Sequence, residues 1–259
     1  MKDRGRFFDL LHRPGAATFA VADEERCLAG EAFTGLVARV AAGLQAAGLE
    51  PGARVVIRLP NRPEAVAAAL AVSLAGGIFA LVDPRLKEGR LAYLVGDCDA
   101  AMLLCRADDG VAPAAAGGRV LLVTLDGSRP GGPAWEELAA HPGPPRPADP
   151  ALDEPAALFY TSGSTGFPKG VTLSHRNLRF TTWSISTYLE NRAGDRILSY
   201  PPLSFDYGFF QAATALRVGA SLFLGRNFFV IDALRRLGEL EITGFPLVPS
   251  MLAMLHMLR

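Results

Sequence analysis

The stretch that decides the fold is Leu158-Phe-Tyr-Thr-Ser-Gly-Ser-Thr-Gly-Phe-Pro-Lys-Gly-Val-Thr-Leu-Ser-His-Arg-Asn-Leu178. Apolar residues lead into a run of small residues, and after Lys169 the apolar Val171 and Leu173 alternate with polar residues. This pattern predicts a strand, a loop and a second strand, followed by a helix that begins near Ser174.

The loop between the two predicted strands has the chemistry of a phosphate site. Its glycines let the backbone approach a ligand, its hydroxyls are hydrogen-bond donors, and Lys169 adds a positive charge. Composition alone favours a plain Gly/Ser hairpin loop instead. Two other loop motifs do not fit, because Pro168 stands where a Walker A loop needs glycine and Ser162 stands where a nucleophile elbow needs glycine.

The segment Tyr160-Thr-Ser-Gly-Ser-Thr-Gly-Phe-Pro-Lys-Gly-Val171 closely resembles the phosphate-loop signature of the adenylate-forming superfamily. That superfamily includes acyl-CoA synthetases, the adenylation domains of peptide synthetases and luciferases. The segments Leu59-Pro-Asn-Arg-Pro-Glu64 and Ala75-Gly-Gly-Ile-Phe-Ala-Leu-Val-Asp-Pro84 resemble earlier landmarks of the same group. The resemblance therefore covers nearly the whole chain.

The resemblance implies an AMP-forming acid–thiol ligase. Such an enzyme uses ATP and Mg²⁺ to convert a carboxylic acid to an acyl-adenylate, and then transfers the acyl group to CoA or to a phosphopantetheine thiol. The carried-over phosphate contacts are Thr161, Ser162, Gly163, Ser164, Thr165, Gly166 and Lys169. Lys169 takes a catalytic role because a cation stabilises charge on the leaving phosphates. Thr165 is the predicted contact to Mg²⁺.

Three residues are candidates for the acid-binding pocket: Phe205, Asp206 and Phe245. In amino-acid-activating relatives the aspartate of a Phe-Asp pair binds the substrate ammonium, whereas the surrounding Pro202-Leu-Ser-Phe-Asp-Tyr-Gly208 also resembles acyl-CoA ligases. We prefer an acyl or similar organic acid and keep an amino acid as the alternative. Asp206 also suits a helix N-cap or a turn, and Phe245 also suits core packing. His175 is expected to be structural, through a hydrogen bond to the preceding loop.

Composition sets limits on partners and compartment. The chain has 259 residues, of which 50% are hydrophobic, and a formal net charge of zero, so neither nucleic acid nor an acidic membrane is an expected partner. Three cysteines without a C-x-x-C pair favour a reducing, cytoplasmic location, and the four scattered histidines do not suggest a metal cluster. The uncharged run Ala65–Val82 reads as a helix, a turn and a strand and not as a membrane span.

Apolar periodicity predicts strands alternating with helices, and hence an α/β fold of wound, largely parallel sheets flanked by helices. The expected division is a first subdomain at 1–140, a proline-rich exposed connector at 141–155, and a second subdomain at 156–259 that carries the loop. The predicted strands are 54–59, 78–82, 100–105, 120–123, 197–200, 221–224 and 242–247. The predicted helices are 31–47, 63–75, 88–96, 174–190, 208–216, 231–240 and 250–258.

In members of this superfamily the adenine-stacking aromatic residue, the ribose-binding aspartate and the lysine of a C-terminal lid domain occur in segments later than the part that this chain matches. We therefore expect an N-terminal portion of such an enzyme, truncated relative to the family and inactive alone. Two alternatives are a non-catalytic protein that binds a nucleotide or a partner, and a phosphotransferase with an unusual loop. An acyl or peptidyl carrier protein is an expected partner of the completed enzyme.

Overall fold

The computed structural model describes residues 5–110, 120–161 and 168–257. In these residues the larger of two sheets has six strands, in the order β6-β5-β3-β4-β7-β8. Neighbouring strands are parallel, except that β7 and β8 form an antiparallel hairpin. The strands are β3 (Arg54–Arg58), β4 (Ile78–Leu81), β5 (Ala100–Arg106), β6 (Leu121–Leu125), β7 (Pro155–Thr161) and β8 (Lys169–Ser174).

The smaller sheet has four strands in the part of the chain that the structure describes, in the order β2-β1-β10-β9. Its strands are β1 (Ala20–Ala22), β2 (Cys27–Ala29), β9 (Arg196–Ser199) and β10 (Ser221–Leu224), and only the β1–β2 pair is antiparallel. Each sheet therefore takes strands from both sides of the segment 141–155. The boundary between the two sheets does not coincide with this segment, because β7 and β8 complete the larger sheet while β1 and β2 complete the smaller one.

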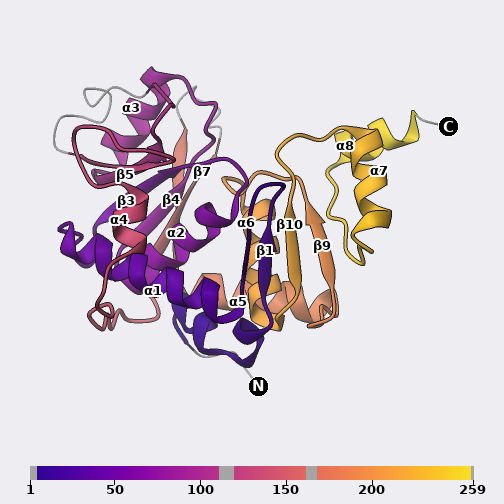
Figure 1. Cartoon of the computed structure of the whole chain (residues 1–259), viewed down its shortest axis with the longest axis horizontal. Helices are drawn as coiled ribbons and strands as arrows, with labels where there is room; N and C mark the ends of the chain where they lie inside the picture. The colour runs from indigo at the N-terminus through magenta and orange to yellow at the C-terminus, as the bar shows by residue number, and fades with distance from the viewer. Residues whose placement is uncertain (1–4, 111–119, 162–167, 258–259) are drawn as a thin grey trace.

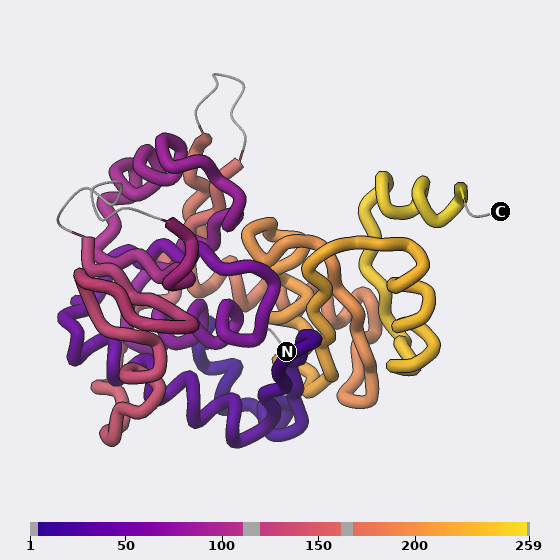
Figure 2. Tube along the Cα trace, turned by 45° about the horizontal axis from the view of Figure 1, so that its top comes forward, coloured from indigo at the N-terminus to yellow at the C-terminus, as the bar shows by residue number. Residues whose placement is uncertain are grey.

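Helices fill the space between the two sheets and cover their outer faces (Figures 1 and 2). One apolar core joins both sheets, and Val55 and Ile57 of β3 point into it while Val56 points into a second core under α3. A third, smaller core lies on the far face of β9, under α7 and α8. The α-helices are α1 (Gly30–Ala46), α2 (Pro63–Leu74), α3 (Glu88–Asp97), α4 (Trp135–Ala139), α5 (His175–Tyr188), α6 (Asp206–Val218), α7 (Val230–Glu239) and α8 (Pro249–His256). Two 3-10 helices, η1 (Phe7–His12) and η2 (Pro14–Ala17), precede β1.

Helix α2 explains the uncharged run in the sequence. Every residue from Pro63 to Ser73 is buried, because the helix is covered on all sides by the shared core. Helix, turn and strand follow one another through this run, as the sequence predicts. Among the described residues, no helix combines the length and the apolar character that crossing a membrane requires.

The predicted fold class of wound, largely parallel sheets flanked by helices is confirmed. The predicted strand at 242–247 is wrong, since this segment makes a single bridge, between Ile197 and Gly244. Its apolar side chains pack on the third core without pairing along the strand. The connector is irregular up to Pro155, and Gln45 and Arg6 bind its backbone at Arg146 and Pro150.

Candidate functional site

The hairpin of β7 and β8 carries the described ends of the predicted phosphate loop. Thr161 and Lys169 are direct partners across the two strands, and both are exposed. Among the described residues Lys169 has no carboxylate partner, so its ammonium group is available to a ligand. The other predicted phosphate contacts lie outside the described residues: Ser162, Gly163, Ser164, Thr165 and Gly166.

A tyrosine fixes the hairpin to the larger sheet's outer helix. The Tyr160 hydroxyl donates a hydrogen bond of 2.8 Å to Oδ2 of Asp97, the last residue of α3. Burial raises the pKa of Tyr160 above its usual range, so the phenol stays protonated and remains a donor. A Cβ on the facing Gly170 would lie only 3.3 Å from the Tyr160 ring, which leaves little space there for a side chain.

His175 anchors the other end of the hairpin. Ser174 caps α5, with its hydroxyl accepting from the Asn177 amide, and this places His175 in the first turn. The imidazole is 2% exposed, and its Nδ1 accepts a hydrogen bond from the Phe7 amide at 3.2 Å. Burial, reinforced by the charge of Arg6, lowers the pKa of His175 to about 4. The side chain is thus neutral at pH 7 and structural, and its described partner is the N-terminal segment instead of the preceding loop.

A cavity of about 1140 Å³ lies between α5, α6 and the segment 243–247. Asp206 and Phe245 line it, so the structure brings together two of the predicted acid-pocket residues. Phe205 is not among the described lining residues; it is the N-cap residue of α6 and is 65% exposed. Asp206 is therefore the first residue of the helix and not its cap.

Most of the residues that line the cavity were not predicted from the sequence. Helix α6 contributes Tyr207, Phe210 and Gln211 in addition to Asp206, which is the spacing of one helix face. Helix α5 contributes a second face, formed by Thr181, Ser184, Ile185 and Tyr188. The α6 residues could have been found by extending the Phe-Asp pair along the helix, whereas the α5 residues belong to no motif.

The wall of the cavity combines aromatic and aliphatic surface with a few charges. The Asp206 carboxylate accepts a hydrogen bond from the Tyr207 amide at 2.7 Å and also lines the cavity. Glu190 and Asp195 add negative charge to the lining and Arg192 adds positive charge. Such a site suits an organic molecule with an apolar body and a small number of polar groups.

An aromatic cluster connects the cavity to the hairpin. In the shared core the Phe209 ring of α6 packs 5.4 Å from the Phe159 ring of β7 and 5.3 Å from the Phe79 ring of β4. Phe159 lies two residues before Thr161, and Phe209 precedes the lining residue Phe210. Close-packed rings leave little freedom for α6 to shift against β7. In the described part of the chain no group of three or more His, Cys, Asp or Glu side chains could hold a metal ion.

Comparisons with known proteins find a matching family model and related sequences. A family model described as AMP-binding enzyme matches residues 11–259. The L-proline–[L-prolyl-carrier protein] ligase of Pseudomonas fluorescens is 34% identical over 209 residues, which is 79% of this chain and 41% of that protein. The anthranilate–CoA ligase of Pseudomonas aeruginosa is 39% identical over 171 residues, 62% of this chain and 32% of that protein.

A solved structure shares the fold over nearly the whole chain. It is the o-succinylbenzoate CoA synthetase of Bacillus subtilis in complex with its acyl-adenylate intermediate, with a TM-score of 0.83 at 24% identity. The match covers 99% of this chain and 51% of that one. This chain thus spans half the length of that enzyme, and less than half the length of the two relatives above.

Proposed function

The chain belongs to the AMP-binding enzyme family, and on this premise we propose that it forms part of an AMP-forming acid–thiol ligase. The reaction is the ATP-dependent activation of a carboxylic acid to an acyl-adenylate, followed by transfer to CoA or to the phosphopantetheine thiol of a carrier protein. The observation that carries the proposal is the position of the cavity, which the aromatic cluster joins to the hairpin bearing Thr161 and Lys169.

The chain's own residues have distinct parts in this reaction. The exposed Lys169 ammonium and Thr161 hydroxyl bind the distal phosphates of ATP, and Lys169 stabilises the charge that grows there as pyrophosphate leaves. The glycines, serines and threonine of 162–166 would add backbone and hydroxyl donors, and the Thr165 hydroxyl would be a ligand for Mg²⁺, which would neutralise phosphate charge. The cavity holds the body of the acid between α5 and α6, so that its carboxylate is presented to the α-phosphorus.

Two classes of acid fit the lining. An acyl or aryl acid suits the apolar wall of Phe210, Phe245 and Ile185, and we favour it. An amino acid is the second candidate, because the Asp206 carboxylate lines the cavity and a carrier-protein ligase for proline is among the relatives. All three cysteines are free thiols, which supports a cytoplasmic location.

Binding of Mg·ATP to residues 1–259 tests the phosphate site directly. We expect Lys169→Ala to weaken binding in calorimetry by roughly 10–100-fold, since one charged donor to a phosphate contributes on the order of 2 kcal/mol. Lys87→Ala removes another exposed lysine, next to α3, and is the matched control. Equal affinity of the wild type and Lys169→Ala would contradict the proposed role.

Pyrophosphate–ATP exchange tests the chemistry. Anthranilate and L-proline, named in the two relatives above, and ferulate, named in a feruloyl-CoA synthase of Amycolatopsis that is 36% identical over 168 residues, form the first substrate panel. We expect residues 1–259 alone to show no exchange, because the loop and the cavity account for only the distal phosphates and the acid. Acid-dependent exchange above that of Lys169→Ala would show that this part of the enzyme suffices.

A further inference from the structure

Asn61 connects the larger sheet to the backbone of the smaller one, across the boundary between the two sheets, here called the junction. It lies between β3 and α2 and is 7% exposed. Its Nδ2 donates to the carbonyl oxygens of Tyr200, Pro201 and Gly225 at 3.2, 3.1 and 3.0 Å, and its Oδ1 accepts from the Leu203 amide at 2.9 Å. The two N–H bonds of one buried amide are thus shared among three carbonyl oxygens, and its oxygen accepts from a fourth backbone group, all on the opposite side of the junction.

Tyr200, Pro201 and Leu203, which Asn61 binds, stand shortly before α6 in the sequence. Helix α6 forms one wall of the cavity that is proposed to hold the acid, here called the acid cavity. Tyr200 and Pro201 follow β9, and Gly225 follows β10, at the carboxyl ends of parallel strands where ligands bind in α/β proteins. The segment 200–205 leads straight into α6, whose first residue is Asp206. Gly208 packs on this turn so closely that a Cβ would lie 2.2 Å from the Pro202 oxygen. The turn and the start of α6 therefore move together.

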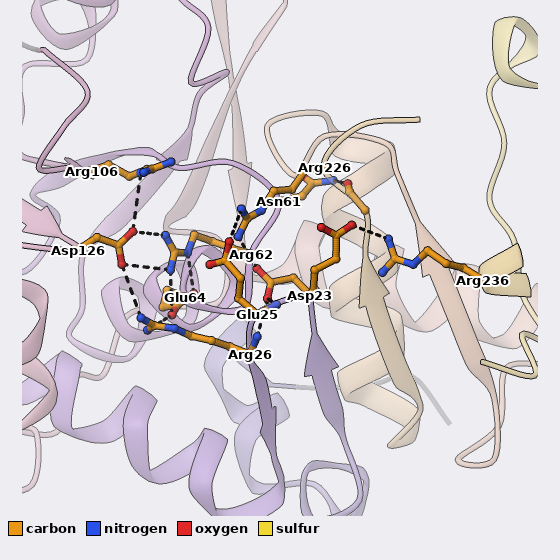
Figure 3. A network of polar contacts seen from close by, with 12 residues as sticks. Asp23, Glu25, Arg26, Asn61, Arg62, Glu64, Arg106, Asp126, Arg226 and Arg236 are labelled. Carbon is orange, nitrogen blue, oxygen red and sulfur yellow. Dashed lines mark hydrogen bonds and ion pairs between the residues drawn. The ribbon is translucent and has the colours of Figure 1, made fainter. Parts of the chain in front are cut away.

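Asn61 is held firmly on its own side of the junction (Figure 3). The neighbouring Arg62 is 2% exposed and forms ion pairs with Glu64 of α2, at 2.8 Å, and with Asp126 after β6, at 2.6 Å. These contacts anchor the loop that carries Asn61 to the larger sheet and its helix. On the other side, Arg226, next to Gly225, forms ion pairs with Asp23 and Glu25.

We propose that Asn61 is a positioning residue for the acid cavity: it sets the start of α6, with Asp206 and Tyr207, against the sheet that carries Thr161 and Lys169. This inference rests on the proposed function. An amide is required because it offers a donor to the carbonyls and an acceptor to the Leu203 amide. A carboxylate would face three carbonyl oxygens with negative charge, and an apolar side chain would leave four buried backbone groups without a partner.

Two probes separate positioning from general stability. Mg·ATP tests the phosphate side alone, whereas an acyl-sulfamoyl adenosine lacks the distal phosphates and places its acyl group in the cavity, with the anthraniloyl, feruloyl and prolyl forms tried in turn. We expect Asn61→Ala to leave Mg·ATP affinity within about twofold and to weaken the best-binding acyl-sulfamoyl adenosine by roughly 10–100-fold, because a displaced start of α6 costs the acyl group one or two contacts, each worth about tenfold. Equal weakening of both probes, or an unchanged affinity for the acyl-sulfamoyl adenosine, would overturn the inference.

Gln45 provides the matched control. Its amide also joins two segments, by hydrogen bonds to the Ala75 oxygen and to both backbone groups of Arg146, and it is not a cavity residue. Gln45→Ala is expected to leave both affinities within about twofold while lowering the thermal midpoint, by less than Asn61→Ala does because its bonds to Arg146 are exposed. If Gln45→Ala weakened the binding of the acyl-sulfamoyl adenosine but not that of Mg·ATP, the effect of Asn61→Ala would not be specific to Asn61, and the inference would fail.

Hydrogen exchange distinguishes failure of this inference from failure of the proposed function. If the wild-type chain binds neither probe, the proposed function fails. Exchange in the wild type and in Asn61→Ala still decides whether Asn61 positions α6. The Leu203 and Phe209 amides should exchange faster in the variant, with the amides of 156–159 in β7 unchanged. Unchanged exchange at 203–209 would overturn the inference whatever the probes do.

Discussion

The buried imidazole of His175 should make the stability of this chain depend on pH. Protonation would turn Nδ1 from an acceptor into a donor, break the hydrogen bond from the Phe7 amide and place a second positive charge near Arg6. The perturbation that isolates this effect is His175→Asn, because an asparagine Oδ1 can take the place of Nδ1 and does not titrate. The pH is then varied from 7 to 5.

The magnitude follows from the two pKa values. The pKa is 6.5 in the unfolded reference and about 4 in the folded chain. Because the folded value is lowered, the unfolded chain binds a proton between these values that the folded chain does not. Stability is therefore full above the unfolded pKa and falls as the pH drops through the window from 6.5 to 4. Integration from pH 7 to pH 5 gives a loss of about 2 kcal/mol, with little solvent screening of a side chain 2% exposed.

Urea unfolding of residues 1–259 at both pH values measures this loss. Carboxylates also titrate in this range, so the informative quantity is the difference between variants. The loss from pH 7 to pH 5 should be about 2 kcal/mol smaller in His175→Asn than in the wild type. His256→Asn, on an exposed part of α8, should behave like the wild type. An equal loss in wild type and His175→Asn, or an NMR titration of the His175 ring with its midpoint near 6.5, would refute the reasoning.

Three further substitutions test the cavity and the junction. Asp206→Ala should weaken binding of the anthraniloyl or feruloyl sulfamoyl adenosine by less than about threefold, whereas a loss of several kcal/mol confined to the prolyl form in calorimetry would identify an amino-acid site. Arg62→Ala should lower the free energy of unfolding by about 2–3 kcal/mol in urea titrations, because it removes the buried partner of Glu64 while the more exposed Arg26 remains; an unchanged midpoint would count against the network. Gly225→Ala should lower the thermal midpoint through a loss of roughly 1–3 kcal/mol, since its Cβ would lie 2.2 Å from the Tyr200 ring, and wild-type stability would contradict that overlap.

Local periodicity predicted most of the helices and strands, because helical and strand spacing are properties of short segments. Helix α1 and strand β3 formed within one residue of their predicted limits. Strands β1 and β2 were missed, since three residues are too few for an alternating pattern. The pairing of β1 with β10 joins segments about 200 residues apart, so no local pattern could have indicated that the two ends of the chain share a sheet.

The residues of the candidate site also fall into those that local sequence predicted and those that it did not. Thr161 and Lys169 were found through a contiguous motif, and Asp206 and Phe245 through resemblance to a family. The α5 wall of the cavity exists only because α5 packs against α6. Nothing in the sequence around Thr181 indicated that this helix would line a cavity. Phe205 was adjacent in sequence to a lining residue, but the start of the helix turns its side chain to a position that is not part of the described lining.

Two kinds of contact cross the junction between the sheets, one charged and one neutral, and they differ in how strictly they fix the relative position of the two sides. Of the side chains labelled in Figure 3, Asn61 and Arg26 reach across it, and Arg26 pairs with Glu64 at 2.6 Å. The Arg26 side chain is 47% exposed, so its ion pair is screened by solvent and tolerates small shifts. The Asn61 amide is buried, and its hydrogen bonds are directional and end on backbone atoms. A displacement of α6 against the larger sheet would therefore strain the bonds of Asn61 before those of Arg26, so that, under the proposed function, the alignment of acid with phosphate would depend on the neutral contact more than on the charged one.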